Sequence, residues 1–328
     1  MIDQRGDQGK KYLVRGLFGV LILISLCFAL LALLNMQSGF EMTVLLSGPL
    51  LWQAVLLQCI ALALFILSWF LLLFFSNGER VSYIEAAAHI GITLVGKYLP
   101  GKFWGLLGRN YLLRHRKFTT GAAIEFLLVD QFLTFYTGIV VGGLALLTVY
   151  NRLFMIPGLV IFLVASSSVL LYFGDVISWL KQTGRGLVRR VTDLQEKEEL
   201  SDTVTVNRVG LLTAMLVYVM HWIAISLVLW MLYYPFLETD PWLNASLLSA
   251  AIPLAMLSGF LAVWAPGGVG VREAVIVGIL AINLPLELAA SIAVTYRLIC
   301  VINDLATGAI ALAYYGGSGL QLLKIQQS

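Results

Sequence analysis

A series of long apolar runs constrains this chain more than any other sequence feature. Each run is near or above the roughly 20 residues that an α-helix needs to cross the hydrocarbon core of a bilayer. Only 12% of the 328 residues are charged, against about a quarter in a typical soluble domain. We therefore predict an all-α polytopic membrane protein with about six full transmembrane helices. The expected helices cover residues 13–34, 50–75, 120–150, 153–173, 209–233 and 288–315.

Two Pro-Gly breaks interrupt the apolar pattern. The first lies within residues 83–113 and leaves arms of about 16 and 13 residues, each too short to cross a bilayer. The second separates two further short arms, residues 247–265 and 271–283. Because proline removes a backbone donor, such breaks occur at membrane depth only where protein or a wet cavity satisfies the freed groups. We expect two re-entrant helical hairpins with tips at Pro100, Gly101, Pro266, Gly267, Gly268 and Gly270.

The order of these parts repeats along the chain. A span, a broken hairpin and a long span with ionisable residues occur at about residues 50–150 and again at about 209–316, joined by residues 153–208. The basic residues between the runs place both termini and the ends of the first hairpin in the cytoplasm by the positive-inside rule. The two units then begin on opposite sides, which predicts an inverted-topology repeat in a single membrane domain, residues 1–328. The two hairpin tips could meet near the bilayer centre.

Ionisable residues are concentrated in the two repeat units. A charge near the bilayer centre costs about 2.5–3.5 kcal/mol on insertion scales, so such groups normally pair or face a wet cavity. Cationic side chains, together with helix starts that follow the two breaks, suit an anionic group such as a phosphate. The candidate substrate-binding residues are Lys102, Arg109, Asp130, Arg272, Glu273, Arg297 and Asp304.

Two structural alternatives stay open for these charges. They could pair with one another and lock the bundle, for example Arg272 or Arg297 with Asp130. Lys97 and Arg109, with the basic residues 114–117, could instead reach the membrane surface and only orient the chain.

The segment that joins the two units is polar. In it Lys181, Arg185 and Arg189 recur every four residues, which fits either a surface helix on anionic headgroups or a solvated connector.

Several other residues are predicted to serve packing alone. Glycines four residues apart in residues 120–150 have the spacing of close helix contacts, and the cysteines match no metal or disulfide spacing. Lone histidines on apolar segments are more often packed than catalytic. These residues are Gly138, Gly142, Cys27, Cys59, Cys300, His89 and His221.

The motifs of common enzyme classes are missing from the sequence. There is no His-Glu-x-x-His, no Gly-x-Ser-x-Gly, no P-loop and no Cys/His ligand cluster. We therefore expect no enzymatic activity, no metal and no cofactor. A formal net charge of +3 is too small to indicate nucleic-acid binding.

Two stretches carry a family resemblance. GKYLPGKFWGLLGRNYLL at residues 96–113 and APGGVGVREAVIV at residues 265–277 resemble the transmembrane region of lysylphosphatidylglycerol synthases, above all its stand-alone, flippase-like members. The resemblance spans roughly residues 10–315 and implies movement of lipid between leaflets. It implies no synthase activity, because the separate soluble domain of the full-length synthases is lacking. It supports the predicted tip residues with Arg109, Arg272 and Glu273, and it fits Asp130 and Arg297 by position.

These observations lead to one main functional prediction and two alternatives. The main prediction is a flippase-like protein of the inner membrane that binds or translocates an anionic, phosphate-bearing phospholipid or polyprenyl-phosphate-linked substrate. The first alternative is a non-transporting membrane partner of a lipid-modifying or glycosyl-transferring enzyme. The second is an ion-coupled transporter of small solutes.

Overall fold

The structure is a computed structural model, and every regular element it describes is a helix. It describes residues 48–76, 80–98, 104–115, 118, 120–172, 175, 207–236, 240–262 and 265–325. The predicted first span, residues 13–34, lies outside these residues, as do Cys27, Lys102, the first tip residues Pro100 and Gly101, and the basic repeat at Lys181, Arg185 and Arg189.

Four of the predicted spans are long apolar helices. They are α3 (Pro49–Phe74), α6 (Thr120–Tyr150), α9 (Arg208–Tyr233) and α12 (Leu286–Ile325). A fifth apolar helix, α7 (Met155–Leu171), is shorter and follows the 3-10 turn η1 (Arg152–Phe154). Within the described ranges, five helices are long and apolar enough to cross a membrane, namely these four and α10. The prediction of an all-α polytopic membrane protein is confirmed.

The first predicted hairpin consists of two short helices that pack against each other. These are α4 (Tyr83–Gly96) and α5 (Trp104–His115), with 14 and 12 residues. The side chain of Ser82 starts α4 by accepting a hydrogen bond from the backbone nitrogen of Glu85 at 3.2 Å. Neither helix is long enough to cross a bilayer alone.

The second hairpin is less symmetric than the sequence predicts. Its second arm, α11 (Val271–Leu280), has 10 residues, but its first arm, α10 (Pro241–Leu261), has 21, enough to span the hydrocarbon core. The prediction of a short first arm that starts at residue 247 is therefore wrong. The side chain of Asp240 caps the helix by accepting from the Trp242 nitrogen at 2.9 Å, and Pro241 fits the first turn. Between the arms lies a 3-10 turn, η3 (Pro266–Gly268).

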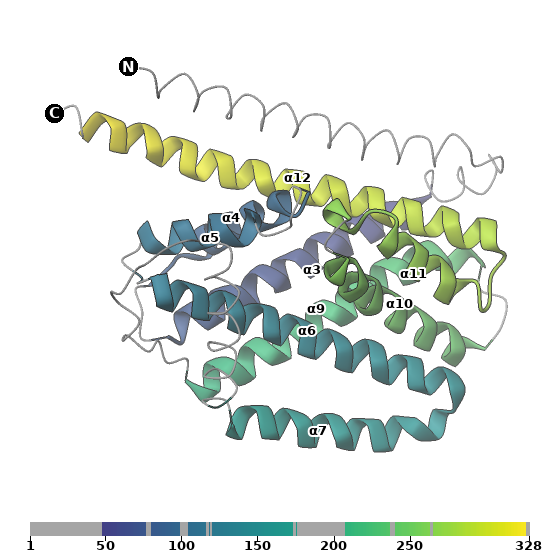
Figure 1. Cartoon of the computed structure of the whole chain (residues 1–328). Helices are drawn as coiled ribbons and strands as arrows, with labels where there is room; N and C mark the ends of the chain where they lie inside the picture. The colour runs from purple at the N-terminus through teal and green to yellow at the C-terminus, as the bar shows by residue number, and fades with distance from the viewer. Residues whose placement is uncertain are drawn as a thin grey trace.

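The two repeat units exchange contacts across the centre of the molecule. The most extensive helix contact is between α3 and α9, which run antiparallel: the Asn207 nitrogen, at the start of α9, donates to the Phe75 carbonyl, at the end of α3, at 3.3 Å. Around this pair α4 packs along α12, and α6 packs along α10 (Figure 1). Each unit thus lays its long final helix on the first hairpin arm of the other. An inverted-topology repeat predicts this exchange of contacts.

Glycines permit the closest of these contacts. A Cβ atom added at Gly91 of α4 would lie 2.4 Å from the backbone oxygen of Thr307 in α12. One added at Gly138 of α6 would lie 2.9 Å from the Trp222 ring, and one at Gly142 would lie 3.0 Å from Pro253 of α10. The predicted packing role of Gly138 and Gly142 is confirmed.

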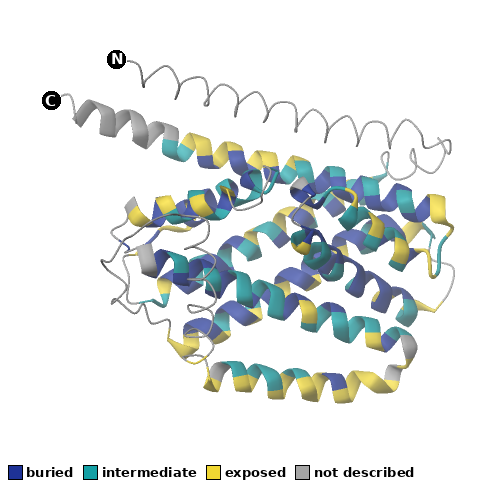
Figure 2. Cartoon of the chain, viewed as in Figure 1, coloured by how far each residue is buried: buried dark blue, intermediate teal, exposed yellow. Residues whose placement is uncertain are grey.

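The outer surface of the helices is apolar. Buried residues follow α3 and α9 through the centre, whereas α7 at the edge shows an exposed face along most of its length (Figure 2). Ile156 and Ile161 on α7 are 69% and 66% exposed. Such a surface suits contact with lipid rather than with water.

Candidate functional site

The tips of the two hairpins touch through their backbones. The Gly267 nitrogen donates a hydrogen bond to the carbonyl oxygen of Lys97 at 2.7 Å. Gly267 has a φ of 61°, in the left-handed region that favours glycine. A Cβ atom there would lie 2.8 Å from the ring of Tyr98. The contact between the tips therefore needs glycine both for its backbone conformation and for its space.

Asp304 of α12 holds the tip of the first hairpin. Its Oδ2 atom lies 2.7 Å from Nζ of Lys97 and accepts a hydrogen bond from the Tyr98 hydroxyl at 2.6 Å. The carboxylate thus binds two consecutive residues at the end of α4.

Arg297, two turns earlier on α12, holds the tip of the second hairpin. Its Nη2 atom donates to the Gly267 carbonyl at 2.7 Å, and its Nε atom forms an ion pair with Oε1 of Glu273 at 3.1 Å. The other carboxylate oxygen of Glu273 accepts from the Gly270 nitrogen at 2.7 Å and so caps α11. At this helix start, one of the two predicted to suit an anionic group, the Gly270 nitrogen is therefore occupied by a side chain of the protein.

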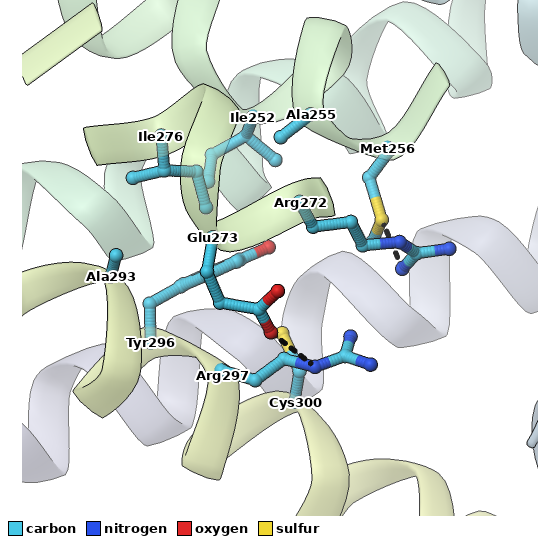
Figure 3. Close-up of a pocket in the computed structure, with 10 residues that line it drawn as sticks. All are labelled: Ile252, Ala255, Met256, Arg272, Glu273, Ile276, Ala293, Tyr296, Arg297 and Cys300. Atoms are coloured by element: carbon cyan, nitrogen blue, oxygen red, sulfur yellow. Dashed lines mark hydrogen bonds and ion pairs between the residues drawn. The ribbon is translucent and has the colours of Figure 1, made fainter. Parts of the chain in front are cut away.

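Arg272 differs from these residues because no described carboxylate lies within ion-pair distance of it. Figure 3 shows its guanidinium group extending away from Glu273 toward Met256, whose sulfur lies 2.7 Å from Nη1. Its Nε atom is buried and has no hydrogen-bond partner. A Cβ atom at Gly259 would come within 2.4 Å of Arg272, so glycine makes room for this side chain.

A cavity of about 170 Å³ lies beside the two tips. Its walls come from both hairpins and from α3, α6, α9 and α12, and its charged lining residues are Lys97, Arg272 and Asp304. Arg272 also lines a smaller pocket of about 10 Å³ with Glu273 and Arg297 (Figure 3). These five residues carry three positive and two negative charges, so the cluster has a net charge of +1. We call them the tip cluster.

Arg109 and Asp130 form a separate pair inside the protein. Arg109 Nη2 lies 2.8 Å from Asp130 Oδ2, and both side chains are 0% exposed. The guanidinium group stacks 3.7 Å from the centre of the Trp69 ring, and the Tyr218 hydroxyl donates to the other oxygen of Asp130. The alternative in which the charges pair with one another therefore holds for Asp130, but its partner is Arg109, and the example of a pair with Arg272 or Arg297 is wrong. The burial of Arg109 also rules out that it reaches the membrane surface.

The family of the chain follows from a comparison with known protein families. The family described as the lysylphosphatidylglycerol synthase TM region matches residues 13–308, which include both hairpins and the tip cluster. The chain belongs to this family. The match confirms the resemblance that the two hairpin motifs carry, and it establishes a multi-pass membrane protein. No curated protein matches the chain.

In this family member, four of the seven candidate residues lie together. Arg272, Glu273, Arg297 and Asp304 join Lys97 in the tip cluster, Arg109 and Asp130 form the separate buried pair, and Lys102 is outside the described residues. Sequence reasoning missed the uncharged polar residues of the cavity. A polar residue inside an apolar span is itself a signal for a cavity wall. The missed residues are Gln58, Thr93, Gln131, Thr134 and Asn303, and His221, assigned to packing from the sequence, also lines the cavity.

Proposed function

We propose that this chain is a flippase-like membrane protein that holds an anionic, phosphate-bearing lipid headgroup beside the hairpin tips and passes it between leaflets. The observation that carries the proposal is the guanidinium group of Arg272, which has no described carboxylate partner and a buried Nε atom without a hydrogen bond, in a cavity whose tip cluster has a net charge of +1. We place the protein in the inner membrane with both termini in the cytoplasm, and we assign it no enzymatic activity.

The charge of the cavity favours an anion. A cation without a counter-charge is unfavourable at membrane depth, and a phosphodiester carries the single negative charge that would balance the tip cluster. A guanidinium group can donate two parallel hydrogen bonds to phosphate oxygens, which a lysine ammonium group cannot do. Arg272 is thus the residue on which we place the phosphate.

The other walls of the cavity suit the lipid part of such a substrate. Leu62, Phe65, Leu94, Leu106, Phe135 and Phe260 line it together with the charged groups. A headgroup on Arg272 would therefore lie next to apolar side chains that can accept the first part of an acyl or prenyl chain.

The two hairpins supply a way to open the cavity. Their tips share the backbone hydrogen bond from Gly267 to Lys97, and each tip is held separately by a residue of α12. In the proposed cycle the tips separate, and one hairpin or the other moves to admit the headgroup from its own leaflet.

Transport in proteoliposomes tests the proposal. Fluorescent phospholipids or polyprenyl phosphates are placed in one leaflet, and their appearance in the other is measured against empty vesicles. The wild-type protein should accelerate the transfer of at least one anionic lipid, and R272Q should abolish it. R114Q is the matched control, because Arg114 is exposed at the end of α5 and lines neither pocket. If no anionic lipid moves faster than in empty vesicles, the proposal is wrong.

A further inference from the structure

The cavity wall contains a buried amide whose oxygen has no hydrogen-bond partner. Gln58 of α3 is only 8% exposed, lines the cavity, and has no hydrogen-bond partner for its Oε1 atom. Leaving such a buried group unpaired is unfavourable, so it marks a place where a partner is expected. No described group of the tip cluster donates a hydrogen bond to this oxygen.

Other uncharged groups surround the same space. The Nδ1 atom of His221 lies 2.7 Å from the carbonyl oxygen of Ala61, so it carries the proton and leaves Nε2 of the neutral ring as an acceptor. The Thr93 and Thr134 hydroxyls donate to backbone oxygens of their own helices, which leaves both hydroxyl oxygens able to accept. The cavity thus combines one unpaired cation with several acceptors that carry no charge.

We infer that the ligand of this cavity is a phosphate ester whose other substituent carries hydroxyl groups, with the phosphate on Arg272 and a hydroxyl group on Gln58. This inference rests on the proposed function and narrows its substrate class. A hydroxyl group both donates and accepts, so it matches an amide in either orientation as well as the histidine and the threonines.

An ammonium-bearing headgroup fits the same walls poorly. The carboxylates of Asp304 and Glu273 already bind Lys97 and Arg297, so no described lining carboxylate remains for a second cation. A zwitterionic headgroup would also leave the net charge of the tip cluster uncompensated. We therefore expect the cavity to disfavour phosphatidylethanolamine.

The size of the cavity agrees with such a ligand. At about 10–15 Å³ for each water-sized group, 170 Å³ accommodates roughly eleven to seventeen such groups. A phosphate with a glycerol group has about ten non-hydrogen atoms, and a phosphate with a hexose somewhat more. Two sources share this chemistry, a glycerophospholipid and a glycosyl polyprenyl phosphate.

Binding by the full-length protein in detergent tests the inference. The probes are short-chain phosphatidylglycerol, a short-chain glycosyl prenyl phosphate, phosphatidic acid, which lacks the hydroxyl-bearing group, and phosphatidylethanolamine. Wild-type protein should bind at least one of the first two more tightly than the last two, and the tighter of the two identifies the source.

Two variants distinguish recognition of the hydroxyl group from recognition of the phosphate. Methionine is close to glutamine in size. Q58M should weaken binding of the hydroxyl-bearing probe about 3- to 10-fold, the size expected for one hydrogen bond. Its affinity for phosphatidic acid should stay within about twofold of the wild-type value. T93V should act in the same direction. T295V is its matched control, because Thr295 is buried, donates to its own helix in the same way and lines neither pocket.

The possible outcomes distinguish the two proposals. The inference is overturned if Q58M and T93V weaken the binding of phosphatidic acid as much as that of the hydroxyl-bearing probe. It is also overturned if phosphatidylethanolamine binds as tightly as the hydroxyl-bearing probes. Either result would still leave a site that binds anions. If R272Q binds every anionic probe as well as the wild type does, the proposed function fails instead.

Discussion

The Gly267 nitrogen and the Lys97 carbonyl oxygen lie 2.7 Å apart and join two hairpins whose tips are about 170 residues apart in the sequence. Each of these residues is also tied to α12, Lys97 through Asp304 and Gly267 through Arg297. The last long helix therefore holds both tips from one face. Substitutions at the contact between the tips should therefore test this arrangement more directly than substitutions elsewhere in either hairpin.

Alanine substitutions at three glycines should differ in effect. G270A should lower the free energy of unfolding by about 1–2 kcal/mol, because φ is 83° there although the space is open. G267A should lower it by about 2–4 kcal/mol, because a methyl group would also press on the Tyr98 ring. G143A, a helical position with open space, should be neutral or slightly stabilising. Thermal unfolding in detergent measures this order, and a G267A protein as stable as G143A would show that the tips do not touch.

The Arg109–Asp130 pair should matter for stability rather than for ligand binding. Because both side chains are 0% exposed, R109M should lower the free energy of unfolding by about 3–5 kcal/mol, the usual result of leaving one buried charge alone. The double variant R109M/D130N should lose less than the sum of the two single variants. In the folded fraction of each variant, affinity for the anionic probes should stay within about twofold of the wild-type value. A large loss of affinity at unchanged stability would instead show that this pair belongs to the binding site.

Much of the architecture could be predicted from the sequence, because apolar length and Pro-Gly breaks act locally. The spans and the first hairpin follow from such local patterns. The start of α10 was missed because the cap at Asp240 adds six residues to a helix that apolarity alone begins at residue 247. The contact between the two tips could be predicted only because the positive-inside rule makes the two hairpins enter the membrane from opposite sides.

The partners of the charges could not be predicted in the same way. Which acid faces Arg109 depends on the rotation of α5 and α6 about their axes, and a single sequence leaves that rotation undetermined. Gln58 was overlooked and His221 was assigned to packing for a different reason. A single polar residue in a span is compatible with packing, and only the geometry shows that both line one cavity.

Two substitutions at one ion pair should change anion affinity in opposite directions. D304N raises the net charge of the tip cluster from +1 to +2, and K97M lowers it to 0, since each removes one charge from three positive and two negative groups. D304N should therefore bind phosphatidic acid more tightly and K97M more weakly. Both variants break the same ion pair, so each serves as the stability control for the other. Affinities that change in the same direction would show that the pair, and not the charge, determines binding.

A reversible crosslink should test whether the first hairpin moves during transport. A Cβ atom added at Gly308 of α12 would lie 3.6 Å from the Cβ atom of Val95 in α4, within the range that a disulfide requires. The variant V95C/G308C should therefore form a disulfide that fixes α4 to α12. If the tips must separate, oxidation should reduce lipid transfer to the level of empty vesicles and leave headgroup binding intact, and a reductant should restore transfer. The single variants V95C and G308C control for pairing with the native cysteines. Unchanged transfer through the oxidised double variant would mean that α4 stays on α12 throughout, and the second hairpin alone would then have to open the cavity.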